Sequence, residues 1–217
     1  MKYIPILFST NMVQAILEGR KTQTRRVIKN FPNSDEAINL KDVYEHSPEY
    51  FYEVSPYGKP GDILWVRETF RKVNHYGFDY EFHQYKAGGT SAHCEVIDMD
   101  QLLHDDKWKP SIHMPKAACR IFLKITDVRV ERLQDISEQD AIAEGIEKLG
   151  ASFGYRNYLN KAGLPVSWYS SYHSFQSLWE NINGSDNWKS NPWVWVISFE
   201  RTTKPEGLGR ISNLLNY

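Results

Sequence analysis

Short segments with alternating or helically spaced apolar residues predict the strands and helices in the first half of the chain. Residues 3–8 predict a strand. Residues 10–19 predict a short helix, with Thr10 as its cap and Gly19 at the position where many helices end in a left-handed conformation. After a turn, residues 63–70 alternate in the way that is typical of a second strand.

The second half of the chain continues this pattern. Residues 118–133 alternate as one long strand or two short ones, and residues 192–201 predict the last strand. Between these strands, residues 137–146 predict a compact helix that Ser137 caps and a glycine ends. Residues 170–184 predict an amphipathic helix. The apolar residues of that helix that we expect to face the core are Tyr172, Phe175, Leu178, Trp179 and Ile182.

Three stretches lack clear periodicity and predict irregular insertions, namely residues 30–58, 71–107 and 150–167. We therefore expect a single domain over residues 1–204, followed by a C-terminal tail over residues 205–217. Several strands, few short helices and irregular connections favour an α+β fold or a small mixed barrel over repeated βαβ units.

Composition and charge narrow the classes of function. The chain has 217 residues, of which 41% are hydrophobic, enough to bury a core. A formal net charge of −1 argues against binding polyanions over the whole surface. The apolar run at the N-terminus is too short for a signal peptide or a membrane span, so we expect a cytoplasmic protein that makes no membrane contact. Neither Cys94 and Cys119 nor the seven histidines have the spacing of a metal site, so we expect no metal.

Positive charge is concentrated in residues 18–26, EGRKTQTRR, around the end of the first predicted helix. The cationic residues of this stretch are Arg20, Lys21, Arg25 and Arg26. Repulsion between like charges, together with partial burial, would lower the pKa of Lys21 and make it a usable base. Such a base can activate the hydroxyl of Thr24 as a nucleophile. The alternative interpretation is a solvated basic turn at a helix end.

Two glutamates are candidates for acid–base chemistry. Glu144 falls in the last turn of a predicted helix, where the helix dipole disfavours an anion, which suits a general acid. The alternative for Glu144 is an ordinary exposed glutamate at a helix end. Glu68 shares a strand face with apolar residues, so its carboxylate needs a buried partner, which Arg26 or Arg120 can supply. For Glu68 we favour a structural ion pair slightly over a catalytic role.

The basic stretch resembles the signature of ASCH domains, G-x-K-x-x-E-x-R. Gly19, Lys21 and Arg26 match that pattern, and Thr24 stands where it has glutamate. A subgroup of small ASCH proteins that hydrolyse N4-acetylcytidine to cytidine and acetate carries the same threonine. The resemblance to these enzymes covers residues 3–29, 60–70, 119–147 and 192–200. Over nearly its whole length the chain looks more like longer, prophage-associated ASCH-like proteins.

The resemblance implies a small PUA-like mixed β-barrel with short helices and loop insertions, and a protein that acts on a nucleoside or RNA. It also implies a metal-independent amidohydrolase without cofactor. In that reaction Thr24 attacks the acetyl carbonyl, Lys21 takes its proton, and Glu144 protonates the leaving amine. The residues that we expect to bind substrate are Arg20, Arg26, Glu68 and Arg67.

Two other functions remain open on the same residues. One is a non-catalytic RNA-binding module, in which the cations contact phosphates and an aromatic side chain stacks on an unpaired base. The other is an ASCH-type ribonuclease, in which Lys21 works with Glu68 or Glu144 as an acid–base pair.

Overall fold

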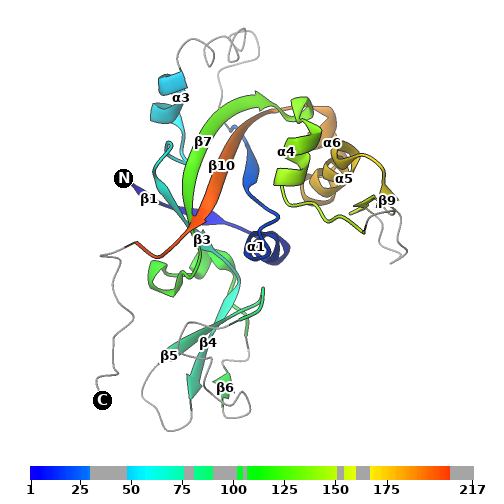
Figure 1. Ribbon diagram of the computed structural model, residues 1–217. Coiled ribbons are helices and arrows are strands. Elements are labelled where there is room, and N and C mark those ends of the chain that lie inside the picture. Colours follow the sequence, from blue (N-terminus) through cyan, green and yellow to red (C-terminus); the bar gives the residue numbers. More distant parts are fainter. Residues whose placement is uncertain are drawn as a thin grey trace. The chain divides into compact units, whose positions relative to one another are not determined.

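The computed structural model describes residues 1–29, 48–75, 81–89, 102–104, 107–150, 154–159 and 167–205. This part of the chain is α+β, with a five-stranded mixed sheet and short helices (Figure 1). It divides into two compact units. The first unit consists of the described parts of Met1–Gln14, Ile63–Lys124 and Arg201–Tyr217, and the second of those of Ala15–Asp62 and Ile125–Glu200.

The five-stranded sheet has the strand order β1-β3-β7-β10-β2. These strands are β1 (Tyr3–Leu7), β3 (Ile63–Arg67), β7 (Phe122–Arg132), β10 (Trp193–Thr202) and β2 (Gln23–Val27). The pair β1–β3 is parallel, whereas β3–β7 and β10–β2 are antiparallel. Among the described residues the order has two ends, β1 and β2, and no pairing that joins them is found.

The first unit also contains an antiparallel sheet with the order β5-β4-β6. Its strands are β4 (Phe70–His75), β5 (Glu81–Tyr85) and β6 (Leu102–His104), and two single-turn helices follow, η3 (Ser111–His113) and η4 (Lys116–Ala118). The expectation that residues 71–107 are irregular is therefore wrong for these strands. Pairing between the strands supplies the order there, and the preference of a segment for strand depends on its cross-strand and same-face neighbours as well as on its own sequence.

The second unit holds most of the helices. They are α3 (Pro48–Val54), η5 (Leu133–Asp135), α4 (Glu138–Ala143), α5 (Ser171–Asn183) and α6 (Ser185–Lys189), and a short pair of strands, β8 (Tyr155–Arg156) and β9 (Ser167–Trp168), lies among them. Figure 1 shows α4, α5 and α6 grouped together. Phe175, Trp179 and Trp188 from these helices pack with Val194 and Val196 of β10 into one core cluster.

Local signals predicted most of the helix ends. The expected cap of the first helix is wrong, because Ser9 and not Thr10 caps α1: Ser9 Oγ accepts a hydrogen bond from Met12 N at 3.4 Å. Helix α1 (Thr10–Leu17) is followed by Gly19 with φ of 76°, and α4 by Gly145 with φ of 87°. The Ser137 side chain accepts a hydrogen bond from Asp140 N and so caps α4, as the sequence indicated. The expectation that Ile182 of α5 faces the core is wrong, because this residue is 52% exposed. No described helix has both the length and the hydropathy needed to cross a bilayer.

Candidate active site

The backbone around Lys21 turns sharply after α1 and brings the chain to the end of α4. Arg20 N and Lys21 N both donate to Ala15 O, at 2.9 and 3.0 Å. Thr22 N then donates to Ala143 O at 2.9 Å, and Lys21 forms an isolated antiparallel bridge with Glu144. The basic stretch is therefore held by main-chain hydrogen bonds in the second unit.

A glycine makes this close approach possible. A Cβ built on Gly145 would lie 2.7 Å from Lys21 Cβ and 3.1 Å from Ala15 Cβ, and its φ of 87° is unfavourable for other residues. Gly145 therefore ends α4 and also makes room for Lys21. Its role is steric as well as conformational.

The side chains of Lys21 and Glu144 form a buried ion pair. Lys21 Nζ lies 2.7 Å from Glu144 Oε2 and 2.9 Å from the Glu144 carbonyl oxygen. The two side chains are 1% and 6% exposed. Burial lowers the pKa of Lys21; Glu144 opposes this effect, and Arg26 and Arg25 add to it. The direction agrees with the expectation from sequence, although burial is a larger cause than the neighbouring cations.

Arg25 is the most enclosed cation of the site, with a side chain that is 0% exposed. Its Nη1 donates to Glu144 Oε1 at 3.1 Å and to Gln23 Oε1 at 2.7 Å. Its Nε and Nη2 lie 2.9 and 2.5 Å from Glu131 Oε1, and Nη2 lies 3.3 Å from Asp140 Oδ2. The guanidinium thus joins carboxylates from β7 and from the α4 region.

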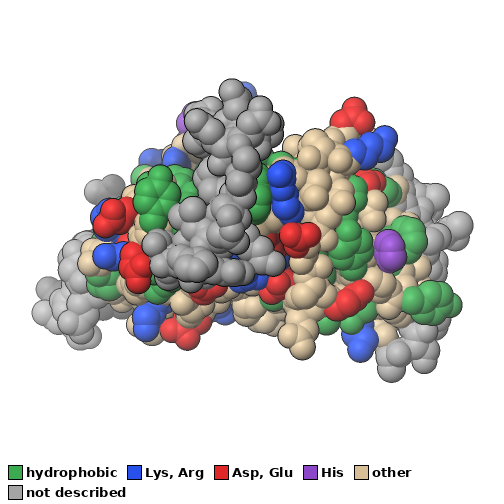
Figure 2. Space-filling view, turned by 90° about the horizontal axis from the view of Figure 1, so that it is seen from above, with side chains coloured by type: hydrophobic (Ala, Val, Ile, Leu, Met, Phe, Trp, Pro, Cys, Tyr) green, Lys and Arg blue, Asp and Glu red, His purple; other side chains and the backbone are tan. Residues whose placement is uncertain are grey.

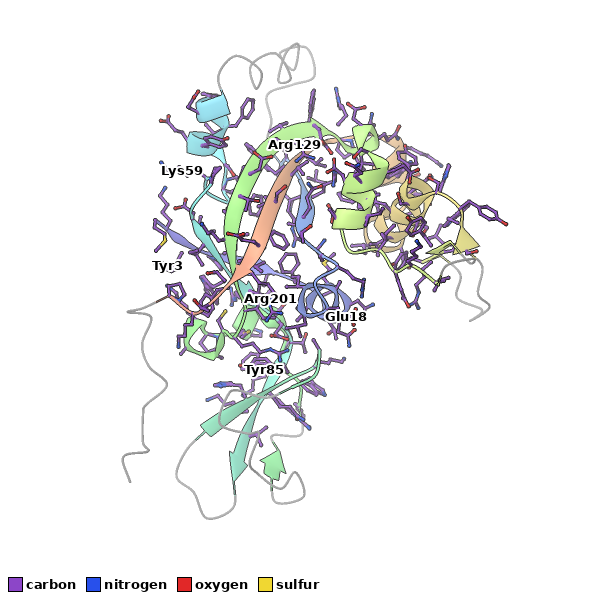
Figure 3. All side chains as sticks on the ribbon, viewed as in Figure 1. Tyr3, Glu18, Lys59, Tyr85, Arg129 and Arg201 are labelled. Atoms are coloured by element: carbon purple, nitrogen blue, oxygen red, sulfur yellow. The ribbon has the colours of Figure 1, made fainter. Side chains whose placement is uncertain are left out.

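Arg129 on β7 extends these contacts. Figure 3 labels Arg129 on the side of β7 toward α4, and its Nη2 lies 2.8 Å from Asp140 Oδ2. Its Nε lies 3.3 Å from Glu131 Oε2. We call the connected side chains the Arg25 network, which consists of Lys21, Gln23, Arg25, Arg129, Glu131, Asp140 and Glu144. Within these side chains three cations face three carboxylates, and Arg129 Nη1 also lies 3.4 Å from a fourth carboxylate, that of Asp127.

Thr24 and Arg26 lie on the other face of β2, because successive strand residues point to opposite faces. Thr24 is buried and pairs across the strands with Ile197, whereas Arg26 pairs with Trp195. No hydrogen bond of the Thr24 hydroxyl is seen among the described residues. The structure therefore brings Lys21 and Glu144 together without a described bond from either to Thr24.

The remaining predicted site residues make other contacts. Arg20 pairs with Glu18, which Figure 3 labels near α1, at 2.5 Å, and it also donates to the Gly145 carbonyl oxygen. Glu68 lies in the first unit, where Arg120 Nε and Nη2 meet its two oxygens at 2.8 and 2.9 Å. The structural ion pair that we favoured for Glu68 is confirmed.

Arg67 belongs to the first unit as well. It donates from Nε to the Met114 carbonyl oxygen at 3.1 Å and also to the Ile112 carbonyl oxygen. Its guanidinium carbon lies 5.5 Å from the centroid of the Trp65 ring. These contacts anchor the segment after β6, which gives Arg67 a structural role.

Sequence reasoning missed part of the site and mistook its environment. The alternative interpretation of residues 18–26 as a solvated basic turn is wrong, since Lys21, Thr24 and Arg25 are buried. The exposed glutamate considered as an alternative for Glu144 is wrong for the same reason. The sequence did not assign Arg129 and Glu131 to the site. A signal was nevertheless present, because Asp127, Arg129 and Glu131 alternate with valines in one predicted strand, a pattern that marks a charged strand face.

In the view of Figure 2, the described Lys and Arg side chains do not cluster on the surface. Lys and Arg side chains there lie interspersed with Asp and Glu side chains. Within the part of the chain that the structure describes, no group of three or more His, Cys, Asp or Glu side chains is placed to hold a metal ion. No family model, curated protein or solved structure matches this chain.

Proposed function

We propose that this protein is a metal-independent amidohydrolase of the ASCH type that removes the acetyl group from N4-acetylcytidine or a related acylated nucleoside. The observation that carries the proposal is the buried contact between Lys21 Nζ and Glu144 Oε2 at 2.7 Å. The resemblance to the small ASCH enzymes implies Lys21 as the base and Glu144 as the acid. A lysine whose pKa is lowered by burial is the kind of base that the reaction needs.

The fold offers further support for the family assignment. The four segments that resemble the small ASCH enzymes contain all five strands of the mixed sheet, apart from the last two residues of β10. They also contain α1 and α4, which flank Lys21 and Glu144. A PUA-like core elaborated by insertions is the architecture that we propose on this basis.

In the proposed reaction the neutral Lys21 amine removes the proton from the Thr24 hydroxyl, and the Thr24 oxygen attacks the acetyl carbonyl carbon. Arg26, which shares a β2 face with Thr24, stabilises the resulting oxyanion. The C–N bond breaks, and the proton reaches the leaving amine through the Lys21–Glu144 pair. Water then hydrolyses the Thr24 ester, releasing acetate and restoring the hydroxyl. Because Thr24 lies on the face of β2 opposite Arg25, this proton transfer requires the Thr24 hydroxyl and Lys21 Nζ to come within hydrogen-bond reach when substrate binds.

The burial of Lys21 and Arg25 favours this reaction over the RNA-binding alternative. Both side chains are paired with carboxylates, so a phosphate would have to displace an existing ion pair to reach them. A binding module instead presents its cations to the nucleic-acid backbone. The ribonuclease alternative uses Glu68 as an acid or base. Both oxygens of that carboxylate already accept hydrogen bonds from Arg120, which argues against this alternative.

The test is acetate release from N4-acetylcytidine by the purified protein in the presence of a chelator. Thr24→Val removes the hydroxyl at nearly constant volume, and we expect it to remove nearly all turnover. Thr24→Ser keeps a hydroxyl and should retain measurable activity. Thr22→Ala is the matched control, because Thr22 is an exposed threonine two positions away.

Equal turnover by Thr24→Val and the wild type would reject Thr24 as the nucleophile. No acetate release by folded wild-type protein would reject the deacetylase. RNA binding that weakens steeply with salt, without hydrolysis, would then decide for the binding module.

A further inference from the structure

The matched motif leaves out two cations of the basic stretch, Arg20 and Arg25, and Arg25 is the one that contacts the Glu144 carboxylate. The motif positions are Gly19, Lys21, Thr24 and Arg26. The structure places Arg25 Nη1 3.1 Å from Glu144 Oε1, while Lys21 Nζ lies 2.7 Å from Glu144 Oε2. Each oxygen of this buried carboxylate therefore has its own cation.

We infer that Arg25 is a positioning residue for the reaction: it holds Glu144 Oε1 so that Oε2 stays against Lys21 Nζ. This inference rests on the proposed function. Arg25 is suited to the task because its guanidinium is fixed on the other side. Glu131 Oε1 receives its Nε and Nη2, and Gln23 Oε1 receives Nη1. A planar fork held at several points has little freedom to move.

No other described cation has this position. Arg129 belongs to the same network, but its partners are Asp127, Glu131 and Asp140, without a described contact to Glu144. Arg20 reaches the Gly145 carbonyl oxygen and Glu18. Arg129 is therefore a matched control, since it is another arginine in the same network that does not hold the Glu144 carboxylate.

The contact between Arg25 and Glu144 also affects the pKa of Lys21. Among the described residues, the charged groups that act on Lys21 include Glu144 from the end of α4 and Arg25 and Arg26 from β2. Arg25 competes with Lys21 for the Glu144 carboxylate and also repels the ammonium form of Lys21. Removing Arg25 should therefore strengthen the hold of Glu144 on the Lys21 proton and raise the pKa of Lys21.

The test compares Arg25→Met and Arg129→Met in the full chain, with Arg25→Lys as the conservative variant. For Arg25→Met we expect kcat for acetate release to fall about tenfold or more, the size of coupling within one ion-pair network, with KM little changed. The rise of kcat with pH should also move to higher pH. Arg129→Met should leave the pH profile in place, and Arg25→Lys should restore part of the rate.

A second measurement is independent of activity. Titration of the Lys21 side-chain nitrogen by NMR should show a higher pKa in Arg25→Met than in the wild type or Arg129→Met. If the wild type releases no acetate, the proposed function fails and this titration still decides whether Arg25 acts on the Lys21–Glu144 pair. An unchanged Lys21 titration in Arg25→Met would overturn the inference. If Arg25→Met does not fold, Arg25→Lys tests the inference. A single ammonium group cannot contact Glu131 and Glu144 together, so an Arg25→Lys variant with the kcat and the pH profile of the wild type would overturn the inference.

Discussion

Lys21 Nζ lies 2.7 Å from Glu144 Oε2, although 123 positions separate the two residues in the chain. Both side chains are almost fully removed from solvent. Removing charged groups from water is costly, and such a pair persists only when its hydrogen bonds are completed. Here the Glu144 carbonyl oxygen and Arg25 supply further contacts. The pair is thus a central feature of the second unit, with consequences for stability and for chemistry.

The first prediction concerns stability. Glu144→Ala leaves Lys21 buried without its carboxylate partner, and we expect the free energy of unfolding to fall by about 3 kcal/mol. Glu147→Ala is the control, because Glu147 lies three positions away, has a side chain that is 43% exposed, and forms its one described ion pair with the exposed Arg156. Its effect should stay within about 1 kcal/mol. Urea unfolding followed by circular dichroism measures both, and equal effects would contradict a dominant role for the buried pair.

The second prediction concerns the pH dependence of the proposed reaction. Lys21 acts as a base only when neutral, and burial lowers its pKa from the ordinary value of 10.5. The rate should therefore rise with pH through a midpoint below 10.5 and then level off. Lys21→Arg keeps a positive charge that cannot be released, so it should abolish the rise along with most of the activity. A rate that is flat with pH in the wild type would contradict Lys21 as the base.

The third prediction concerns the glycine at the end of α4. Gly145→Ala combines an unfavourable φ with a contact of 2.7 Å to Lys21 Cβ, and we expect it to cost about 2–4 kcal/mol of stability. Gly19→Ala is the matched control, since Gly19 also has a positive φ, of 76°, but its added Cβ meets nothing within 4 Å. That variant should cost about 1–2 kcal/mol. Thermal and urea unfolding compare the two, and equal losses would show that crowding against Lys21 is unimportant.

The fourth prediction concerns the contact between α4 and α5. Burial tends to raise the pKa of Glu138, but hydrogen bonds from Ser170, Ser171 and the Tyr172 main chain outweigh it and lower the pKa below the usual 4.5. A depressed carboxylate pKa stabilises the fold at pH values above 4.5, and this contribution disappears as the pH falls through the folded-state pKa.

Glu138→Gln should therefore lower the free energy of unfolding at neutral pH, and its difference from the wild type should shrink toward acid pH. Chemical unfolding of both proteins at a series of pH values measures that difference. A difference that stays constant with pH would mean that the charge of Glu138 does not contribute.

The elements that could be predicted are those whose causes are local. Ser137 caps α4, Gly19 and Gly145 follow the ends of α1 and α4, and alternation marks β3 and β7. These signals depend on neighbours within a few positions, which sequence spacing records directly. Ile182 is an exception to the local signals, because its spacing fits the apolar face of α5 but the residue is 52% exposed. Strands β4 to β6 gave weak local signals and were missed.

For the candidate site, the sequence was enough to select the side chains that we propose to carry chemistry: Lys21, Thr24 and Glu144 followed from residue types, spacing and the resemblance to a family. The folded structure was needed to show that Lys21 contacts Glu144, that Thr24 lies on the opposite face of β2 from Arg25, and that Arg25 is the second partner of the carboxylate. Contacts of this kind depend on strand order, on the turn after α1 and on burial from solvent. These are properties of the whole folded chain, and no local spacing encodes them.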